Sequence, residues 1–440
     1  MSLYGTARRI AAVFREAGHT VYFAGGCVRD RLLGRPVKDI DIAVSASPGE
    51  VERLFPHTVA QGRSFGVITV LADGAAFDVA SFRCDGYYAD GRRPDGVRPA
   101  TPQEDARRRD ITINGLFEDP ETGDILDYVG GRQDLDRRVI RMIGCADDRI
   151  REDKLRMLRV VRFAAVLDFE VDPGTFEAVA KYAADIGQVS CERIGTEFTR
   201  MLCESRKASV ALELLADTGL LKQFLPELLT LKECTQPPEF HPEGDVWVHT
   251  LMMLDALPAP RNPELMFAVL LHDVGKPATR QELAGRIRFP CHAVHSERIA
   301  RSVLQRLKCS GDRIQIVSEI IRRHMNIADV REMRESRLRR WFGSPSIDLE
   351  LELARLDMLC SSGDISLWNF ACERLAGFRN EPVLPPPFIR GGDLIAAGLK
   401  PGPDFTRILN DLYDRQLEGE FTDKSAAELA LKALTGMAGT

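Results

Sequence analysis

The stretch that most constrains the fold of this 440-residue chain runs from Tyr22 to Val44 and reads YFAGGCVRDRLLGRPVKDIDIAV. A short apolar run ending at Ala24 is typical of a strand, and Gly25 and Gly26 allow a tight turn that brings the backbone close to a phosphate. Cys27 to Leu33 can form a short helix, whose N-terminus favours an anionic group. This half of the stretch therefore predicts a phosphate-binding turn between a strand and a helix.

The second half of the stretch places two carboxylates at alternate positions. On a strand, Asp39 and Asp41 point to one face while Ile40 and Ile42 point to the other. Two carboxylates on one face can hold Mg²⁺, and a pair of such ions can activate an attacking hydroxyl and neutralise a leaving pyrophosphate. The alternative is an ordinary strand whose aspartates face water. We predict that Asp39 and Asp41 are catalytic and bind Mg²⁺.

The overall composition excludes several classes of protein. The net charge of −6 offers no global basic signature, so binding of RNA has to depend on a local basic patch. Ten cysteines without a C-x-x-C pair argue against a disulfide framework or a zinc ribbon. The first residues do not show the charged-then-apolar pattern expected of a leader, and the longest apolar run, Leu265 to Leu271, is too short to span a bilayer. We therefore expect a cytoplasmic protein with no membrane contact.

The residues around the first stretch predict an α/β arrangement. Thr6 to Ala17 carry apolar residues at helical spacing, which predicts a helix behind the first strand. Val67 to Leu71 and Ala76 to Phe82 read as two strands, and Asp73-Gly74 between them is typical of a hairpin turn.

The motifs GGCVRD, from Gly25 to Asp30, and KDID, from Lys38 to Asp41, resemble the opening motif of the class II tRNA nucleotidyltransferases and bacterial poly(A) polymerases. This family belongs to the polymerase-β-like nucleotidyltransferase superfamily. The resemblance implies that Gly25, Gly26 and Arg29 bind the nucleotide. It also implies a third catalytic carboxylate on a neighbouring strand, for which Asp78 is the candidate.

Two further segments extend the resemblance. The glycine-rich segment from Asp85 to Arg98 is long enough for a functional loop. In the family, a flexible loop here is needed to add the terminal A, which disfavours an enzyme that adds only CC. The sequence RRDITING resembles the family motif R-R-D-x-T-x-N-A, with Gly115 in place of alanine. Its side chains can contact phosphates and ribose hydroxyls, and the nucleotide-binding candidates are Arg108, Arg109, Asp110 and Asn114.

Asp147 to Leu167 has the pattern of one long amphipathic helix. Within it, EDKLR resembles the family motif E-D-x-x-R, which implies that Asp153 and Arg156 act as a protein template for the incoming base. A carboxylate accepts a hydrogen bond from the exocyclic amine of C or A, and a guanidinium donates to the adjacent ring nitrogen. Arg159, on the same polar face, is a further nucleotide-binding candidate. Considered alone, the pair is more typical of an exposed i, i+3 ion pair, a common surface feature, and only the upstream Gly-Gly and D-x-D motifs favour the template.

Six of the eight histidines lie between His241 and His324, and one of them belongs to the dyad His272-Asp273. Imidazole and carboxylate groups can share a divalent metal. The order resembles the HD phosphohydrolase domain of some members of the family. This implies a second divalent-metal site, for which the candidate ligands are His249, His272, Asp273, His295, His324 and Asp357. The alternative is an HD fold kept only as a structural body.

Together these motifs imply an α+β protein: a polymerase-β-like head with a small mixed sheet, followed by an all-helical neck, body and HD domain. We predict a head at residues 1–145, a helical neck and body at 146–238, an HD domain at 239–380 and a helical tail at 381–440. The implied function is template-independent addition of C, C and A to the 3′ end of tRNA from CTP and ATP. An A-adding enzyme, a poly(A) polymerase, a CC-adding enzyme and a protein acting mainly as an HD phosphohydrolase remain as alternatives, and the oligomeric state is not predicted.

Overall fold

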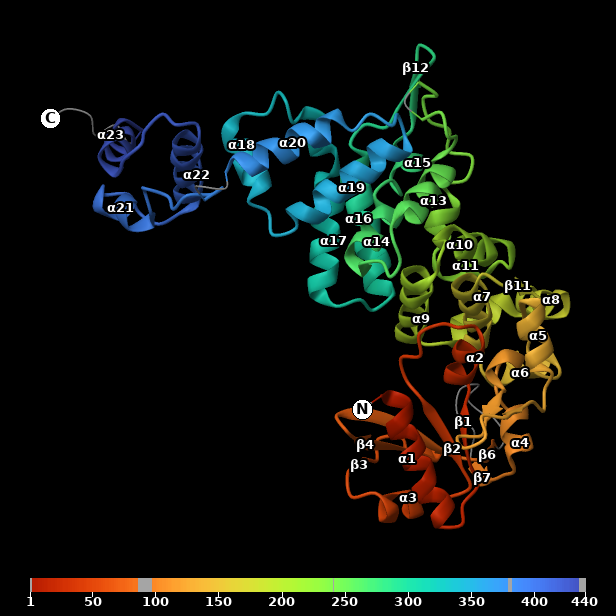
Figure 1. Ribbon diagram of the computed structural model, residues 1–440. Coiled ribbons are helices and arrows are strands. Elements are labelled where there is room, and N and C mark those ends of the chain that lie inside the picture. Colours follow the sequence, from red (N-terminus) through yellow and green to blue (C-terminus); the bar gives the residue numbers. More distant parts are fainter. Residues whose placement is uncertain (1, 86–96, 240, 379–381, 435–440) are drawn as a thin grey trace. The chain divides into compact units, whose positions relative to one another are not determined.

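The computed structural model describes residues 2–85, 97–239, 241–378 and 382–434, and it divides into two compact units (Figure 1). The first unit extends to Leu229 and includes Leu257–Pro263 and Arg306–Cys309. The second unit takes the rest of the described chain. Most of the loop predicted at residues 85–98 lies outside the described residues, since these omit 86–96.

The first unit begins with a seven-stranded mixed sheet in the order β3-β4-β5-β2-β1-β8-β9. Strand β2 pairs in parallel with β5, and the other neighbours in the sheet are antiparallel. The strands are β1 (Val21–Ala24), β2 (Asp41–Val44), β3 (Thr58–Val59), β4 (Val67–Ala72), β5 (Ala75–Ser81), β8 (Phe117–Glu118) and β9 (Ile125–Leu126). The predicted small mixed sheet is confirmed.

Short helices and turns connect these strands in ways that the local sequence explains. Ser2 caps the first helix, since its Oγ accepts a hydrogen bond from the N–H of Gly5 at 3.1 Å. The hairpin between β4 and β5 turns through Asp73 and Gly74, both with positive φ, as predicted. Helix α1 (Leu3–Glu16) precedes the first strand, and α5 (Gly131–Arg137) and β10 (Val139–Ile140) follow the last one. The elements between the strands are α2 (Gly26–Leu32), α3 (Pro48–Leu54), η1 (Arg63–Phe65), β6 (Arg83–Asp85), β7 (Val97–Pro99), α4 (Pro102–Arg107) and η2 (Thr112–Asn114).

The predicted alternation around the two aspartates is present, although the strand is shorter than expected. Strand β2 begins at Asp41, so Asp39 precedes it. Ile40 and Ile42 are buried, whereas Asp39 and Asp41 are exposed. The apolar side chains therefore anchor this segment in the core and leave both carboxylates on the opposite side.

The single helix predicted over Asp147–Leu167 is wrong. The segment forms α6 (Ala146–Glu152) and α7 (Leu155–Leu167), and Asp153 between them is extended with φ −147°. The Asp153 Oδ1 atom accepts a hydrogen bond from the N–H of Leu155 at 3.0 Å. An aspartate side chain that bonds a nearby backbone N–H competes with a continuous helix, which explains the break.

More helices complete the first unit, and residues 139–140 and 170–171 form a small parallel pair. The remaining elements are β11 (Glu170–Val171), α8 (Pro173–Tyr182), η3 (Ala183–Gln188), α9 (Cys191–Glu204), α10 (Ala208–Asp217), α11 (Leu220–Phe224) and α12 (Pro226–Leu229).

Among its described residues, the second unit is helical apart from one small hairpin, which confirms the predicted fold class. None of the described helices is long and apolar enough to cross a membrane. The elements are α13 (Val246–Ala256), α14 (Pro263–Leu271), α15 (Lys276–Thr279), β12 (Gln281–Leu283), β13 (Arg286–Arg288), α16 (His292–Arg306), α17 (Gly311–Arg323), η4 (His324–Asp329), α18 (Glu335–Phe342), α19 (Ile347–Cys360), α20 (Ser366–Gly377), α21 (Gly391–Ala396), α22 (Pro403–Leu417) and α23 (Lys424–Leu434).

Candidate functional site

A pocket of about 830 Å³ lies in the first unit and gathers nearly all the residues predicted for nucleotide chemistry. Its lining carries eleven basic side chains and six carboxylates, although the whole chain has a net charge of −6. The basic residues are Arg29, Arg35, Lys38, Arg83, Arg108, Arg109, Arg156, Arg159, Arg162, Arg193 and Arg200. The acidic residues are Asp30, Asp39, Asp41, Asp110, Asp153 and Glu204. The pocket therefore provides the local positive charge that a polyphosphate or a nucleic acid requires.

The glycine pair forms one end of this pocket. Gly25 precedes α2 with φ 75° and ψ −126°, a conformation that favours glycine. A Cβ atom added to Gly25 would lie 3.0 Å from Nη1 of Arg109 and 3.9 Å from Oδ2 of Asp41. The absence of a side chain at Gly25 thus brings the backbone turn, a guanidinium and a carboxylate within reach of one ligand.

The two predicted catalytic carboxylates, Asp39 and Asp41, both line the pocket. Although Asp41 is exposed to the pocket, the surrounding walls partly desolvate its carboxyl and, with Asp39, raise its pKa to about 6. Arg109 opposes this increase in pKa. Two carboxylates that repel one another are typical of a site for a divalent cation, so these residues fit Mg²⁺.

Asp78, the predicted third carboxylate, lies on β5 beside this pair. Its neighbour Val79 pairs with Ile42 in the parallel register, so Asp78 lies next to Asp41 across the sheet. The Asp78 Oδ1 atom accepts a hydrogen bond from Oγ1 of Thr69 at 2.6 Å. Among the residues predicted for nucleotide chemistry, only Asp78 is not part of the described pocket lining.

A buried carboxylate that the sequence did not single out organises the two motif arginines. Asp105 on α4 accepts from Arg108 through Oδ1 and from Arg109 through Oδ2, at 2.6 and 3.0 Å. Burial alone would raise the pKa of Asp105, but the two guanidinium groups lower it below its ordinary value. The acidic position in QEDARRRD was the available signal, since an i, i+3 and i, i+4 spacing places Asp105 against both arginines.

The remaining motif residues form a second buried network. Asn114 Oδ1 accepts from Nη1 of Arg29 at 2.7 Å, and Asn114 Nδ2 donates to Oδ1 of Asp110 at 3.3 Å. Asp110 Oδ2 accepts from Nη2 of Arg159 at 2.6 Å. Burial opposes ionisation of Asp110, but Arg159 outweighs it and brings the pKa of Asp110 to about 2. Both oxygens of Asp110 are therefore engaged, which favours a supporting role over direct contact with ribose.

Asp153 and Arg156 both line the pocket, but they are held by other residues rather than by each other. Asp153 Oδ2 accepts from Nη2 of Arg193 at 2.8 Å. Arg156 forms an ion pair with Glu152 and donates to the carbonyl oxygen of Arg108 at 3.2 Å.

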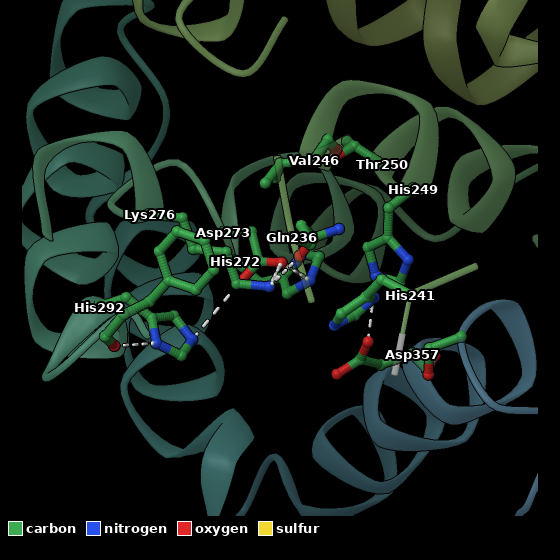
Figure 2. Close-up of polar contacts among 12 residues, drawn as sticks. Gln236, His241, Val246, His249, Thr250, His272, Asp273, Lys276, His292 and Asp357 are labelled. Carbon is green, nitrogen blue, oxygen red and sulfur yellow. Dashed lines mark hydrogen bonds and ion pairs between the residues drawn. The ribbon is translucent and has the colours of Figure 1, made fainter. Parts of the chain in front are cut away.

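A second group of titratable side chains lies within the second unit (Figure 2). Figure 2 shows imidazole and carboxylate groups from separate helices turned toward one another. Three sets of ligand atoms are each close enough to hold one metal ion: His249 with His272 and Asp357, Asp273 with His292 and His324, and His241 with Glu243 and His249. The dyad His272-Asp273 contributes one residue to each of the first two sets.

The hydrogen bonds of the imidazoles specify which nitrogen is free. The Nδ1 atoms of His292 and His324 donate to the carbonyl oxygens of Phe289 and Ile321 at 3.0 and 2.7 Å. When both rings are neutral, each Nε2 atom is left as a hydrogen-bond acceptor. Yet the two Nε2 atoms lie 3.1 Å apart, and Oδ1 of Asp273 lies 3.5 Å from Nε2 of His292. Converging acceptors repel each other unless a cation lies between them, so the donor set fits a divalent metal.

The first set, which consists of His249, His272 and Asp357, also has imidazole rings whose Nδ1 atoms contact other protein groups. His272 donates through Nδ1 to the carbonyl oxygen of Val269 at 2.9 Å, and His249 Nδ1 lies 2.7 Å from Glu243 Oε1. Both Nε2 atoms, and Oδ1 of Asp273, are buried and make no hydrogen bond among the described residues. The Nε2 atoms of His249 and His272 instead lie 3.1 Å from Oδ1 of Asp357 and Oδ2 of Asp273. Buried ligand atoms that converge without hydrogen bonds are expected where an ion completes the site.

The structure brings together five of the six predicted HD ligands and leaves out His295. The His295 Nδ1 atom lies 3.1 Å from Nη2 of Arg298, and His295 belongs to none of the three sets. His292, one helical turn earlier on α16, is 8% exposed and lies in the cluster. The sequence CHAVH contains both histidines at positions that could each supply a ligand. Only the packing of α16 shows that His292, and not His295, faces the other ligands.

Three family models match this chain. Residues 21–141 match the poly A polymerase head domain, residues 168–231 match the probable RNA and SrmB-binding site of polymerase A, and residues 245–359 match the HD domain.

Curated relatives and solved structures agree with these models. CCA-adding enzymes of Bacillus subtilis (strain 168) and Geobacillus stearothermophilus are 43% and 44% identical over 215 residues, which are 49% of this chain and 54% and 52% of those proteins. The chain thus matches about half the length of these curated relatives. The crystal structure of the Bacillus stearothermophilus CCA-adding enzyme in complex with CTP is 27% identical, with a TM-score of 0.76 over 99% of each chain. The Thermotoga maritima CCA-adding enzyme complexed with tRNA_CCA shares the fold, at 18% identity and a TM-score of 0.58.

Proposed function

Since this chain belongs to the family of class II tRNA nucleotidyltransferases and bacterial poly(A) polymerases, we propose that it adds C, C and A to the 3′ end of tRNA from CTP and ATP. The single observation that carries this proposal is the pocket in which Asp39 and Asp41 face a wall of guanidinium groups, with Asp153 and Arg156 in the same lining. The relatives named as CCA-adding enzymes support the proposal. Such a reaction belongs in the cytoplasm, with the tRNA.

In the proposed reaction, the 3′-hydroxyl of the RNA attacks the α-phosphate and pyrophosphate leaves. Asp39 and Asp41 hold Mg²⁺, which when bound activates the hydroxyl and neutralises the charge on the leaving group. Asp78 completes the carboxylates by its position beside Asp41. The chain contributes mainly positioning and charge, because phosphoryl transfer requires little covalent chemistry from a protein.

The triphosphate is held by the turn and the arginines around it. Gly25 and Gly26 allow the backbone to approach the phosphates, and Arg29 and Arg109 supply positive charge beside that turn. Arg108, held by the same carboxylate as Arg109, continues this surface.

The other motif residues hold the sugar and the base. Asn114 lies where it can contact ribose, supported by Asp110, which Arg159 in turn fixes. Asp153 and Arg156 select the base, since a carboxylate accepts from the amine of C or A and a guanidinium donates to the neighbouring ring nitrogen. UTP and GTP present a carbonyl oxygen where the carboxylate requires a donor.

We propose four functional regions: the head at residues 1–145, the neck and body at 146–238, the HD domain at 239–380 and the tail at 381–440. The matches at 21–141, 168–231 and 245–359 fall within these regions. The two compact units support a division near Leu229, slightly before the proposed start of the HD domain.

The test is incorporation by the purified protein with Mg²⁺ on three transcripts of one tRNA, which end before CCA, after C and after CC. Ordered addition of C, C and A to the first transcript is the expected result. Addition of A only to the CC-ended transcript would instead identify an A-adding enzyme, long A tails a poly(A) polymerase, and arrest after CC a CC-adding enzyme. The variant Asp39→Ala serves as the inactive control.

A second candidate activity, hydrolysis of a phosphate ester by the HD domain, is favoured by the two converging Nε2 atoms of His292 and His324. We propose that the HD domain binds two divalent ions. His272 binds one ion together with His249 and Asp357, and Asp273 binds the other together with His292 and His324. Metal content of the purified protein, measured by mass spectrometry, tests this stoichiometry. Phosphatase assays on the Asp39→Ala, Asp41→Ala variant then separate this activity from nucleotide incorporation.

A further inference from the structure

The carboxylate of Asp153 is fixed from two sides in the first unit. Its Oδ1 atom accepts from the N–H of Leu155 at 3.0 Å, and its Oδ2 atom accepts from Nη2 of Arg193 at 2.8 Å. The Asp153 and Arg193 side chains are 18% and 23% exposed, and both line the pocket. A charge-assisted hydrogen bond in such a partly buried place restricts the direction in which a carboxylate can accept further bonds.

Arg193 lies on a helix, α9, that a buried ion pair joins to α7. Arg162 on α7 donates through Nε to Oε1 of Glu197 on α9 at 2.6 Å, with both side chains less than 8% exposed. Arg193 lies one helical turn before Glu197, so the two side chains share a face of α9. The pair that joins α9 to α7 therefore lies one turn from Arg193, on the helix that carries it.

Arg156, like Asp153, is held by an oppositely charged side chain and by backbone hydrogen bonds. It forms an ion pair with Glu152, and it donates through Nη1 to the carbonyl oxygen of Arg149 at 3.0 Å and through Nη2 to that of Arg108 at 3.2 Å. Glu152 also pairs with Arg149. Each member of the pair Asp153 and Arg156 thus has its own partner of opposite charge.

We propose that Arg193 is a positioning residue that sets base selectivity by fixing the acceptor direction of Asp153, an inference that rests on the proposed function. A carboxylate has about four acceptor positions, so Asp153 retains capacity for one amine after its two protein bonds. Arg193 keeps that capacity aimed into the pocket. Without Arg193 only the N–H of Leu155 holds the carboxylate, so its Oδ2 atom can bind water. A bound water can donate to the carbonyl oxygen of U or G, which removes the discrimination.

The experiment compares wild type with Arg193→Gln and Arg193→Lys, and it measures kcat/KM separately for CTP, UTP, ATP and GTP. For Arg193→Gln we expect the CTP-to-UTP and ATP-to-GTP ratios to fall by roughly tenfold or more, in the range of one directed hydrogen bond to a base. Arg193→Lys keeps the charge without the planar guanidinium, so its ratios should lie between those of wild type and Arg193→Gln.

The matched control is Arg151→Gln, which removes the same charge two residues from Asp153. Arg151 pairs with Asp148 at 3.1 Å, and their side chains are 60% and 59% exposed. Both ratios should match those of wild type in this variant, because exposed ion pairs contribute little.

The outcomes separate the inference from the function on which it rests. Equal loss of activity with all four nucleotides, or unchanged ratios in an active Arg193→Gln enzyme, would assign Arg193 a structural role and overturn the inference alone. No incorporation of any nucleotide by wild type would overturn the proposed function itself. If thermal unfolding shows that Arg193→Gln does not fold, the ratios of Arg193→Lys decide, and wild-type ratios in that variant overturn the inference.

Discussion

The pocket of the first unit and the histidine cluster of the second both gather groups that fit divalent metals, but the charged groups of the two sites differ in their exposure to solvent. In the pocket, Asp39 and Asp41 are exposed and face many guanidinium groups. In the cluster, His249, His272 and Asp273 are 0%, 1% and 3% exposed, and several of their polar atoms make no hydrogen bond among the described residues.

This difference in exposure fits the kind of ligand that each site is proposed to bind. A site for a polyphosphate and an RNA end must exchange large anions, so its carboxylates remain in contact with solvent and its cations are held by other protein groups. A site for metal ions can desolvate its ligands permanently, because the bound cation supplies the interaction that water would otherwise provide. Exposure therefore separates a site that exchanges substrates from one that retains ions.

The largest expected effect comes from removing a pocket carboxylate. Asp39→Ala should reduce nucleotide incorporation by about a thousandfold or more, because the proposed two-metal site would lose a ligand and its charge stabilisation. Asp39 is exposed, so the melting temperature should change little. The control Asp148→Ala removes an exposed carboxylate outside the pocket lining and should retain incorporation. An active Asp39→Ala enzyme would contradict the role assigned to the pocket.

The next effect tests which histidine belongs to the cluster. His292→Ala should weaken binding of Mn²⁺, measured by titration calorimetry, by about a hundredfold, since a direct ligand contributes at least as much as the outer-shell groups around metals. His295→Ala is the matched control on the same helix and should leave the affinity unchanged, since His295 lies outside the three ligand sets. The reverse result would contradict the placement of His292.

A smaller effect concerns the pH dependence of the pocket. Because the pKa of the metal-free Asp41 carboxyl is raised to about 6, a proton should compete with Mg²⁺ for this group, and the apparent affinity for Mg²⁺ should fall by up to about tenfold per pH unit below that value. The Mg²⁺ concentration that gives half-maximal incorporation, measured at several pH values, checks this, and a concentration that stays constant between pH 5 and 7 would contradict it.

The raised pKa of Asp41 also makes the stability of the protein depend on pH, and stability changes in the opposite direction to the affinity for Mg²⁺. A carboxyl whose pKa is raised on folding stabilises the protein fully below the unfolded value of 3.8, and this contribution is lost as the pH rises through about 6. Asp41→Asn should therefore raise the melting temperature of the metal-free protein above pH 6, and the difference should disappear near pH 4.

The smallest effect concerns the helix that supports Arg108 and Arg109. Thr101 and Glu104 form a capping box at the start of α4, with the N–H of Glu104 3.3 Å from Oγ1 of Thr101. Thr101→Ala should destabilise the protein by about 1 kcal/mol in urea unfolding, whereas Thr101→Ser should retain the cap. Equal stability of both variants would contradict the contribution assigned to the cap.

Local sequence was sufficient for the elements of the head and for most of the pocket. The strand and turn before Gly25, the hairpin at Asp73-Gly74 and the alternation around Asp41 all follow from residues within a few positions of each other. The helix break at Asp153 was missed because the apolar spacing continues through it, and only the hydrogen bond from the Asp153 side chain to Leu155 shows why the helix stops.

By itself the sequence determined which chemical groups are present and how they are spaced along each segment, since turn geometry, strand alternation and motif order are short-range properties. The tertiary structure decided which partner each charged group takes. Asp153 meets Arg193 forty residues away, and His292 rather than His295 faces His324 from another helix. Such pairings depend on how helices pack and rotate against one another, and a rotation of one residue exchanges a buried ligand for an exposed one without changing the amphipathic pattern.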